Sequence, residues 1–218
     1  MKVRILAAVV AAMGLAGAAQ ANDAADSRFA VTAGIVSQHL GGDKPLNVSL
    51  IEAPASAQVE SDRSDSGAAL GFNWFINRNI AIELWGASRF DADTEIDMEN
   101  AADIGVSRYR TRPLALSAQY HFTQLGDRVT PYVGLGIHHT KVDGEWFNPA
   151  FGGSHDFRIS DGTGVAATLG LDVNLPKNWF VRGDVRYLRW NSDVQLDNMR
   201  SDASMHSLIY GVSAGLRF

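Results

Sequence analysis

The hydrophobic pattern of the chain has a period of two residues, most clearly in its last stretch, 205–218. From Leu208 onward the alternate residues are apolar, and Gly, Ser and Arg occupy the positions between them. Such alternation predicts a β-strand with one apolar and one polar face, because successive side chains of a strand point to opposite sides. The same period recurs earlier in the chain. We therefore expect eight strands, over residues 28–38, 67–76, 80–91, 108–123, 129–142, 161–175, 179–196 and 205–218.

The connections between these strands alternate between long and short, beginning and ending with a long one. The long connections are polar stretches, and the short ones are tight turns such as Asn77-Arg78-Asn79 and Pro176-Lys177-Asn178. An outer-membrane barrel has short turns at its periplasmic end and longer loops outside, whereas a soluble sandwich or lipocalin-like barrel gives no reason for this alternation. The pattern predicts an all-β fold, an eight-stranded antiparallel up-and-down transmembrane β-barrel with short periplasmic turns and long extracellular loops.

Composition alone does not separate a soluble protein from a membrane barrel. The chain is 46% hydrophobic and 20% charged, which suits both, since only alternate residues of a barrel strand meet lipid. It has no cysteine, which excludes a disulfide framework and thiolate metal sites. The net charge of −5 gives no support for nucleic-acid binding, which usually requires a basic patch.

The N-terminal residues predict export. Lys2 and Arg4 precede an apolar run over 5–19, and Ala19-Gln20-Ala21 follows as an A-x-A cleavage site. This is the arrangement of a secretory signal peptide, and the run is too short to span a membrane comfortably. We expect residues 1–21 to be cleaved as a signal peptide, and residues 22–218 to form a single barrel domain in the outer membrane.

Several stretches resemble the OmpW family of small outer-membrane proteins, and they occur in strand order along most of the mature chain. They are Arg112-Pro113-Leu114, 118–122, Pro131-Tyr132-Val133-Gly134-Leu135-Gly136-Ile137, 170–173, Asn178-Trp179-Phe180-Val181, 184–187 and Gly215-Leu216-Arg217-Phe218. The resemblance implies an eight-stranded barrel with both termini in the periplasm. It also implies a role in passing small hydrophobic molecules across the outer membrane.

Aromatic residues are expected at both membrane interfaces, where amphipathic rings favour the head-group level. Seven lie near the short turns: Trp74, Phe75, Phe122, Tyr132, Trp179, Phe180 and Phe218. Four lie near the loops: Phe90, Tyr109, Tyr187 and Trp190. In the last strand we expect an assembly signal for the barrel-assembly machinery, formed by Tyr210, Leu216 and Phe218.

The inward-facing residues are the candidates for channel chemistry, and charge is concentrated on the third and seventh strands. Those strands lie on opposite walls of an eight-stranded barrel. One hypothesis is a polar gate in which Glu83 faces Arg182 or Arg186. The other is a lumen filled by paired charges for stability, because eight strands leave just enough width for side chains. Both hypotheses predict partners for the buried charges. The lumen and gate candidates are Glu83, Trp85, Arg89, Arg182, Asp184 and Arg186.

A hydrophobic conduit also requires apolar residues inside, and the candidates for such an apolar route are Trp85, Leu188 and Trp190. A substrate would enter from outside and leave sideways through the wall, avoiding the charged waist. A continuous water pore is disfavoured because porin-like channels need roughly twice as many strands. The alternative is a non-conducting structural, adhesion or receptor barrel.

Catalysis and metal binding find little support. His206 and Ser207 are adjacent in a strand and therefore point to opposite faces, as do His138 and His139. We expect no enzymatic activity, no metal and no cofactor. The expected partners are outer-membrane lipids and lipopolysaccharide, the barrel-assembly machinery and small hydrophobic solutes, with no nucleic acid. The expected state is a monomer.

Overall fold

The computed structural model describes residues 27–42, 58–60, 63–97, 104–126, 128–147, 157–196 and 199–218. The predicted signal peptide, 1–21, lies outside these residues. A short 3₁₀ helix covers Thr123–Leu125, and the described part of the chain contains no helix long and apolar enough to cross a membrane. The remaining elements are strands: β1 (Phe29–Gly42), β2 (Gln58–Glu60), β3 (Arg63–Phe75), β4 (Ile80–Ala87), β5 (Phe90–Asp97), β6 (Ile104–His121), β7 (Val129–Phe147), β8 (Phe157–Ile159), β9 (Gly162–Asn174), β10 (Trp179–Leu196) and β11 (Met199–Arg217).

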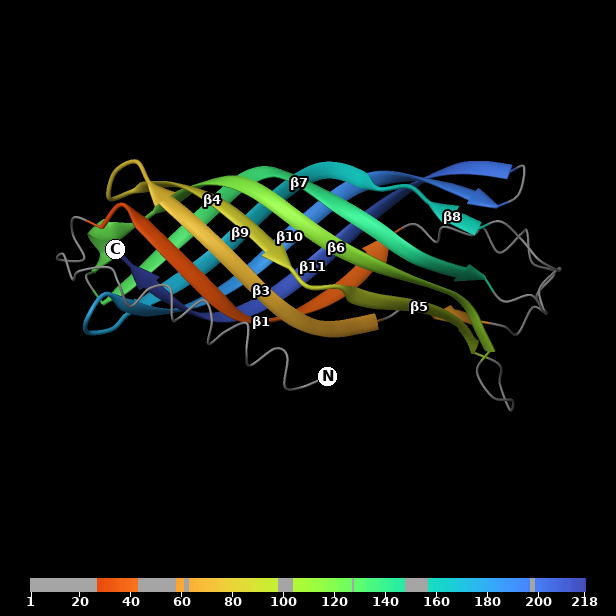
Figure 1. Ribbon diagram of the computed structural model, residues 1–218, viewed down its shortest axis with the longest axis horizontal. Helices are drawn as coiled ribbons and strands as arrows, with labels where there is room; N and C mark the ends of the chain where they lie inside the picture. Colours follow the sequence, from red (N-terminus) through yellow and green to blue (C-terminus); the bar gives the residue numbers. More distant parts are fainter. Residues whose placement is uncertain are drawn as a thin grey trace.

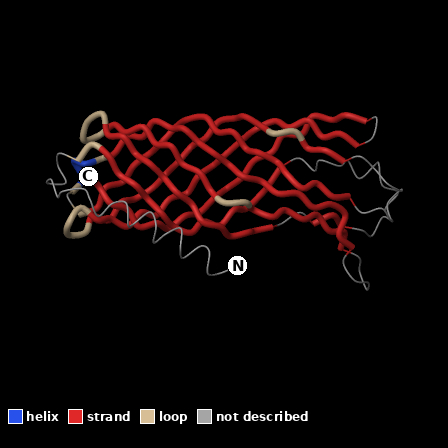
Figure 2. Tube along the Cα trace, viewed as in Figure 1, coloured by secondary structure: helices blue, strands red, loops and turns tan. Residues whose placement is uncertain are grey.

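These segments form one closed antiparallel barrel (Figures 1 and 2). Three pairs of segments continue one another: β2 with β3, β4 with β5, and β8 with β9, so the barrel has eight strands. Each strand pairs with its neighbours in chain order, through short turns at one end and long connections at the other. The predicted fold is therefore confirmed, with short periplasmic turns and long extracellular loops.

The first and last strands close the barrel. β1 pairs with β11 from Ala30 opposite Arg217 to Gly42 opposite Met205. Beyond this ladder, the Phe29 N–H donates to the Phe218 carbonyl at 3.0 Å, and the Phe218 N–H donates to Phe29 at 2.9 Å. This closure pairs the N–H and C=O groups of β1 with those of β11, so neither strand is left as an open edge facing lipid.

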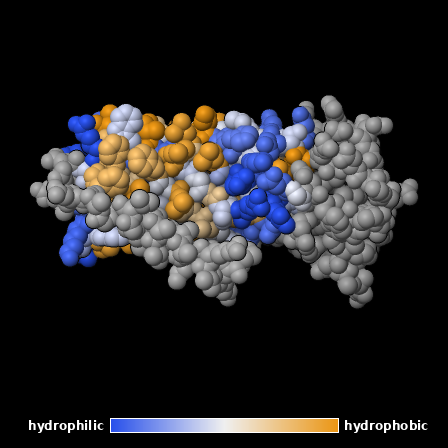
Figure 3. Space-filling view, viewed as in Figure 1, coloured by the Kyte–Doolittle hydropathy of each residue, from blue (hydrophilic) through white to orange (hydrophobic). Residues whose placement is uncertain are grey.

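The outer face carries an apolar band, and the inner face holds charged and polar side chains together with apolar ones. Leu135 is 73% exposed and Ile35 is 66% exposed, whereas charged side chains such as Glu83 and Arg182 are buried. This arrangement is the reverse of a soluble protein and is the one expected where lipid surrounds the barrel. Figure 3 shows the apolar side chains gathered over the turn end of the barrel, with strongly hydrophilic side chains beyond them toward the loops.

A break between β4 and β5 changes which residues face inward. In β4 the odd-numbered positions from Ala81 to Ala87 are buried, including Glu83 and Trp85. The next buried residue after Ala87 is the even-numbered Phe90. At the break, the Ser88 N–H donates to the Ala68 carbonyl at 2.7 Å, and the Ser88 hydroxyl accepts from the Ala68 N–H at 3.0 Å. Both groups bond to one residue of β3, so the alternation restarts one position later. Arg89 is consequently exposed, and its prediction as a lumen residue is wrong.

The predicted aromatic girdles are only partly present. Trp74 and Tyr187 are exposed on the outer face. Other rings fill the lumen instead, because an inward ring can occupy the space above a neighbouring glycine; Gly170 lies beside Tyr132, and Gly215 beside Phe180. The predicted girdle residues that are buried inside the barrel are Phe75, Phe90, Tyr109, Tyr132, Phe180 and Trp190.

Candidate functional site: the barrel lumen

The middle of the lumen holds a group of interlocked charges, which we call the ionic lock. Its members come from β4, β9, β10 and β11, on the inward faces of these strands, and all are largely buried. Three carboxylates meet three guanidinium groups, so the formal charges of the lock cancel. The members are Glu83, Asp172, Asp184, Arg182, Arg186 and Arg217.

Arg182 bridges the two walls of the barrel. On one side its Nε and Nη2 donate to the two carboxylate oxygens of Asp172, at 2.7 and 3.0 Å. On the other side its Nη1 donates to Glu83 Oε1 at 3.0 Å and to Asn73 Oδ1 at 3.2 Å. Since β4 and β10 lie across the lumen from each other, the guanidinium spans the barrel. Arg182 is 1% exposed, so these bonds replace the water it has lost.

Arg186 makes the second cross-lumen pair. Its Nη1 donates to Glu83 Oε2 at 2.6 Å, and its Nη2 donates to Glu83 Oε1 at 3.1 Å and to Asp184 Oδ2 at 2.9 Å. Arg217 completes the lock, because its Nη2 donates to Asp172 Oδ2 at 3.0 Å. The predicted facing of Glu83 with Arg182 or Arg186 is thus present in the geometry, and Glu83 contacts both.

Aromatic rings hold the guanidinium groups in place. The Arg182 guanidinium carbon lies 4.5 Å from the centre of the Tyr132 ring, and that of Arg186 lies 4.5 Å from the Trp85 ring. The Tyr132 hydroxyl donates to Asp184 Oδ2 at 3.2 Å, and its ring stacks on His121. Cation–π contacts of this kind gain strength when the cation is desolvated, as it is here.

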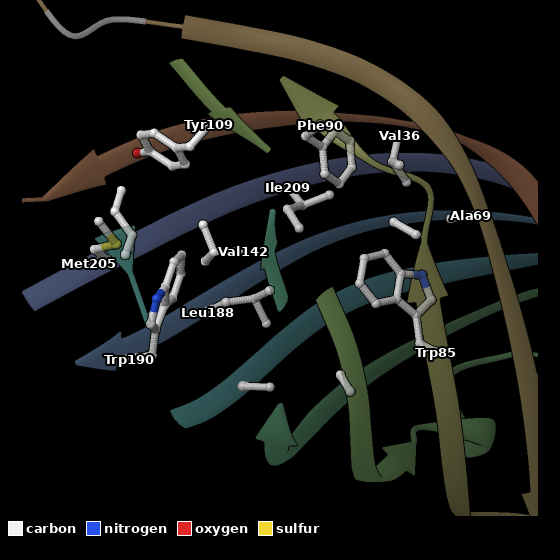
Figure 4. Close-up of a cluster of buried hydrophobic side chains, with 14 residues drawn as sticks. Val36, Ala69, Trp85, Phe90, Tyr109, Val142, Leu188, Trp190, Met205 and Ile209 are labelled. Atoms are coloured by element: carbon white, nitrogen blue, oxygen red, sulfur yellow. The ribbon is translucent and has the colours of Figure 1, made fainter. Parts of the chain in front are cut away.

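On the loop side of the lock, the inner face of the barrel becomes mostly apolar. Figure 4 shows this apolar section, in which Trp85, Leu188 and Trp190 belong to one cluster of buried side chains. Trp85 borders the lock, whereas Trp190 lies farther toward the loops. The full set is Val36, Ala69, Trp85, Ala87, Phe90, Tyr109, Ala115, Val142, Ile159, Ala166, Leu188, Trp190, Met205 and Ile209.

A few polar side chains interrupt the apolar section, and they bond to one another. The Gln38 amide donates to Ser207 Oγ at 2.8 Å, and the Thr111 hydroxyl donates to Gln38 Oε1 at 3.1 Å. His138 Nδ1 lies 3.0 Å from Thr140 Oγ1. These bonds satisfy polar groups that would otherwise be costly beside apolar surface.

The alternation of the sequence predicts most residues of the ionic lock. The two residues that it does not predict are missed for the same reason. Glu83, Asp184, Arg182 and Arg186 were expected inside and lie there, and the apolar-route residues share one cluster. Asp172 and Arg217 occupy inward positions too, but neither was singled out as a candidate. Charged residues at inward positions of adjacent strands would have been the signal, because such charges need partners across the strand pair.

Neither of the two neighbouring pairs, His206 with Ser207 and His138 with His139, forms a catalytic site or a metal site. His206 is exposed, whereas Ser207 is buried and accepts a hydrogen bond from Gln38, so the two side chains diverge as expected. His138 is buried and His139 is exposed in the same way. Within the described residues there is no group of three or more His, Cys, Asp or Glu side chains placed to hold a metal ion.

A closed antiparallel barrel with an apolar exterior and buried charged side chains in a filled interior defines an integral outer-membrane β-barrel protein. The sequence comparisons then assign the family. The model of the OmpW family matches residues 30–218, and the chain belongs to this family of non-enzymatic outer-membrane barrels. Outer membrane protein W of Vibrio cholerae serotype O1 is 26% identical over 201 residues, covering 87% of this chain and 88% of that protein.

Two solved structures have the same fold. The crystal structure of OprG from Pseudomonas aeruginosa matches with a TM-score of 0.63 and 18% identity, covering 88% of this chain and 96% of OprG. The solid-state NMR structure of AlkL in DMPC lipid bilayers matches with a TM-score of 0.61 and 23% identity, covering 92% of this chain and 94% of AlkL. Membership of the OmpW family places the protein in the outer membrane, embedded in its lipid bilayer.

Proposed function

We propose that this barrel is a narrow uptake route for small hydrophobic molecules. A molecule enters at the loop end, contacts the apolar section, and leaves sideways through the barrel wall into the membrane. The observation that carries the proposal is the order of the two lumen zones: an apolar section on the extracellular side, followed by a charged lock that crosses the lumen. The role that the family resemblance implies agrees with this order.

The lock disfavours passage straight through the barrel. An apolar molecule moving past Glu83 would have to separate it from Arg182 and Arg186, leaving buried charges unpaired. Breaking one buried pair costs about 3–5 kcal/mol, and the apolar molecule offers nothing in return. The lipid outside the barrel offers apolar surroundings that the lock does not, so the proposed exit is sideways through the wall.

Uptake of an apolar fluorescent probe into proteoliposomes with lipopolysaccharide in the outer leaflet tests the proposal. Leu188→Gln places an unpaired amide in the apolar section, which costs about 1 kcal/mol or more and should slow uptake by roughly fivefold. Glu83→Gln changes the lock and should leave uptake at the wild-type rate. Heat-modifiable mobility on gels confirms that each variant is folded.

Two outcomes would contradict the proposed route. Unchanged uptake in Leu188→Gln removes the apolar section from the path, and a large change in Glu83→Gln places the path through the lock. The cross-lumen ion pairs also favour a second candidate, a non-conducting structural, adhesion or receptor barrel. Wild-type proteoliposomes that take up no more probe than empty liposomes would support that function.

A further inference from the structure

The outer face of the barrel changes from apolar to charged over three successive outward residue pairs on β6 and β7. Leu116 lies opposite Ile137 in the strand ladder, and the exposed side chains below this pair on the same two strands are apolar or aromatic, such as Tyr120 and Leu135. Four residues closer to the loops, beyond the pair Leu114 and His139, Arg112 lies opposite Lys141, and both side chains are exposed on the outer face. The cations thus lie directly above the extracellular edge of the apolar band, at the depth of the outer head groups.

Two cations opposite each other on one sheet face repel and destabilise the pair unless an anion lies between them. Lys141 has a single ion pair, to the partly exposed Asp143 at 3.5 Å, and Arg112 has no ion-pair partner among the described residues. The adjacent Arg110 bonds to Asp91 at 3.0 Å, so its charge is compensated in a way that Arg112 is not. The surface at Arg112 and Lys141 therefore has cationic charge available for an external anion.

We infer that Arg112 and Lys141 form a binding site for a phosphate group of the phosphorylated glycolipid in the outer leaflet, lipopolysaccharide. A guanidinium holds a phosphate through two parallel hydrogen bonds, and an ammonium adds a compact charge beside it. The exposed Leu114, Leu116 and Ile137 below the cations are placed to contact the acyl chains of the same molecule. One lipid thus satisfies both the charged and the apolar part of this surface.

Charged residues of both signs flank the pair on the outer face. On one side of the pair, Phe90 lies opposite Thr111, so the exposed Arg89 lies next to Arg112. On the other side, Thr163 lies opposite His139, so the exposed Asp161 is the outward residue beside Lys141. His139 on β7 lies next to the pair, but its Nε2 is 3.7 Å from Asp161, so it is already engaged. Asp161 therefore compensates positive charge on the β7 side, whereas Arg112 and the neighbouring Arg89 make the β6 side cationic. This inference does not depend on the proposed uptake function.

Native mass spectrometry of the folded full chain in detergent, with diphosphorylated lipid A as the probe, tests the site. Each cation near a lipid phosphate contributes about 1 kcal/mol, so the double variant Arg112→Gln/Lys141→Gln should weaken binding at least tenfold. Arg78→Gln, which removes one exposed cation from a turn at the opposite end, should bind lipid A like the wild type. Both substituted positions are exposed, and heat-modifiable mobility verifies that each variant folds.

The source of the phosphate is tested with three further probes. Dephosphorylated lipid A should bind the wild type as weakly as the double variant binds the intact lipid. Phosphatidylglycerol should bind weakly, and inorganic phosphate alone should not displace lipid A. The assignment is overturned if the double variant binds lipid A like the wild type. It is also overturned if phosphatidylglycerol or inorganic phosphate matches lipid A, because that indicates general charge attraction or a free-phosphate site.

Discussion

Glu83 is the residue on which both cross-lumen contacts of the ionic lock depend. Its two carboxylate oxygens accept hydrogen bonds from Arg182 and Arg186, and it is fully buried. Arg182 also bonds to Asp172, and Arg186 to Asp184, but both aspartates lie on the same side of the lumen as the arginines. Loss of the Glu83 charge would leave excess positive charge in a site without bulk water, which is costly.

The Glu83→Gln substitution should therefore lower the free energy of unfolding by about 3 kcal/mol, since it breaks a buried ion pair while preserving side-chain shape. Urea titration of the protein in phospholipid vesicles, followed by tryptophan fluorescence, measures this change. As a control, Arg110→Gln breaks the exposed pair with Asp91 and should cost less than about 1 kcal/mol. Equal unfolding midpoints for Glu83→Gln and the wild type would contradict a stabilising role for the lock.

Sequence alternation predicts the side on which a residue lies, but it does not predict partners. It located Glu83 and Arg182 on facing walls, because an eight-stranded ring fixes which strands oppose each other. It failed for Arg89, since the Ser88 bonds to Ala68 that reset the alternation are a tertiary feature. Asp172 was missed as a partner because its bond to Arg182 depends on strand register, which alternation leaves open.

Among the elements, the strands pack the lumen by placing glycines beside aromatic rings. A Cβ atom on Gly170 of β9 would clash with the Tyr132 ring of β7, and one on Gly215 of β11 would clash with the Phe180 ring. Tyr132 has little freedom to move, because it stacks on His121 and contacts Arg182. The glycines of these strands thus decide where rings and guanidinium groups lie.

The Gly170→Ala substitution should destabilise the barrel by about 2 kcal/mol, because the added methyl group overpacks the lumen against the fixed Tyr132 ring. The matched control is Gly183→Ala on β10, where an added Cβ meets no atom within 4 Å. Urea unfolding of both variants in the same vesicles measures the difference. Should the two alanine variants prove equally stable, the packing argument for Gly170 is wrong.

The element pattern itself was largely predictable. Eight strands and alternating short and long connections follow from the two-residue period and from turn residues such as those at 77–79 and 176–178. The aromatic girdles are predicted less well, because aromatic residues near the strand ends lie on the inner face of the barrel as well as on the outer face. Phe180 and Trp179 are adjacent in sequence, yet only the inward Phe180 is fully buried. Ring position along a strand therefore does not indicate which face it occupies.

For the molecule as a whole, the barrel exists only when its two ends meet. Phe218 bonds to Phe29 through both backbone groups, and the two ring centres lie 6.1 Å apart. Tyr210 and Leu216 lie on the outer face of the same strand, in the predicted assembly signal. The signal role of these residues stays a prediction.

Deletion of Phe218 should reduce assembly of the barrel in cells, because the machinery would lose the terminal aromatic residue of the signal. Phe218→Tyr keeps an aromatic terminus and should assemble normally. The yield of heat-modifiable protein in outer-membrane fractions measures both, and refolding in detergent shows whether each chain retains the ability to fold. Normal assembly of the deleted protein in cells would rule out the signal.

The bond between Arg182 and Glu83 also has a mechanical consequence, because it links two opposite strands of the barrel across the lumen and so acts as a brace. A hollow cylinder flattens under side pressure, but a brace across its diameter keeps the cross-section round at that level. The brace lies at the lock, whereas the apolar section above it relies on side-chain packing and on neutral hydrogen bonds such as that between Gln38 and Ser207. Lateral pressure from the membrane should therefore deform the barrel above the brace first, leaving its waist rigid.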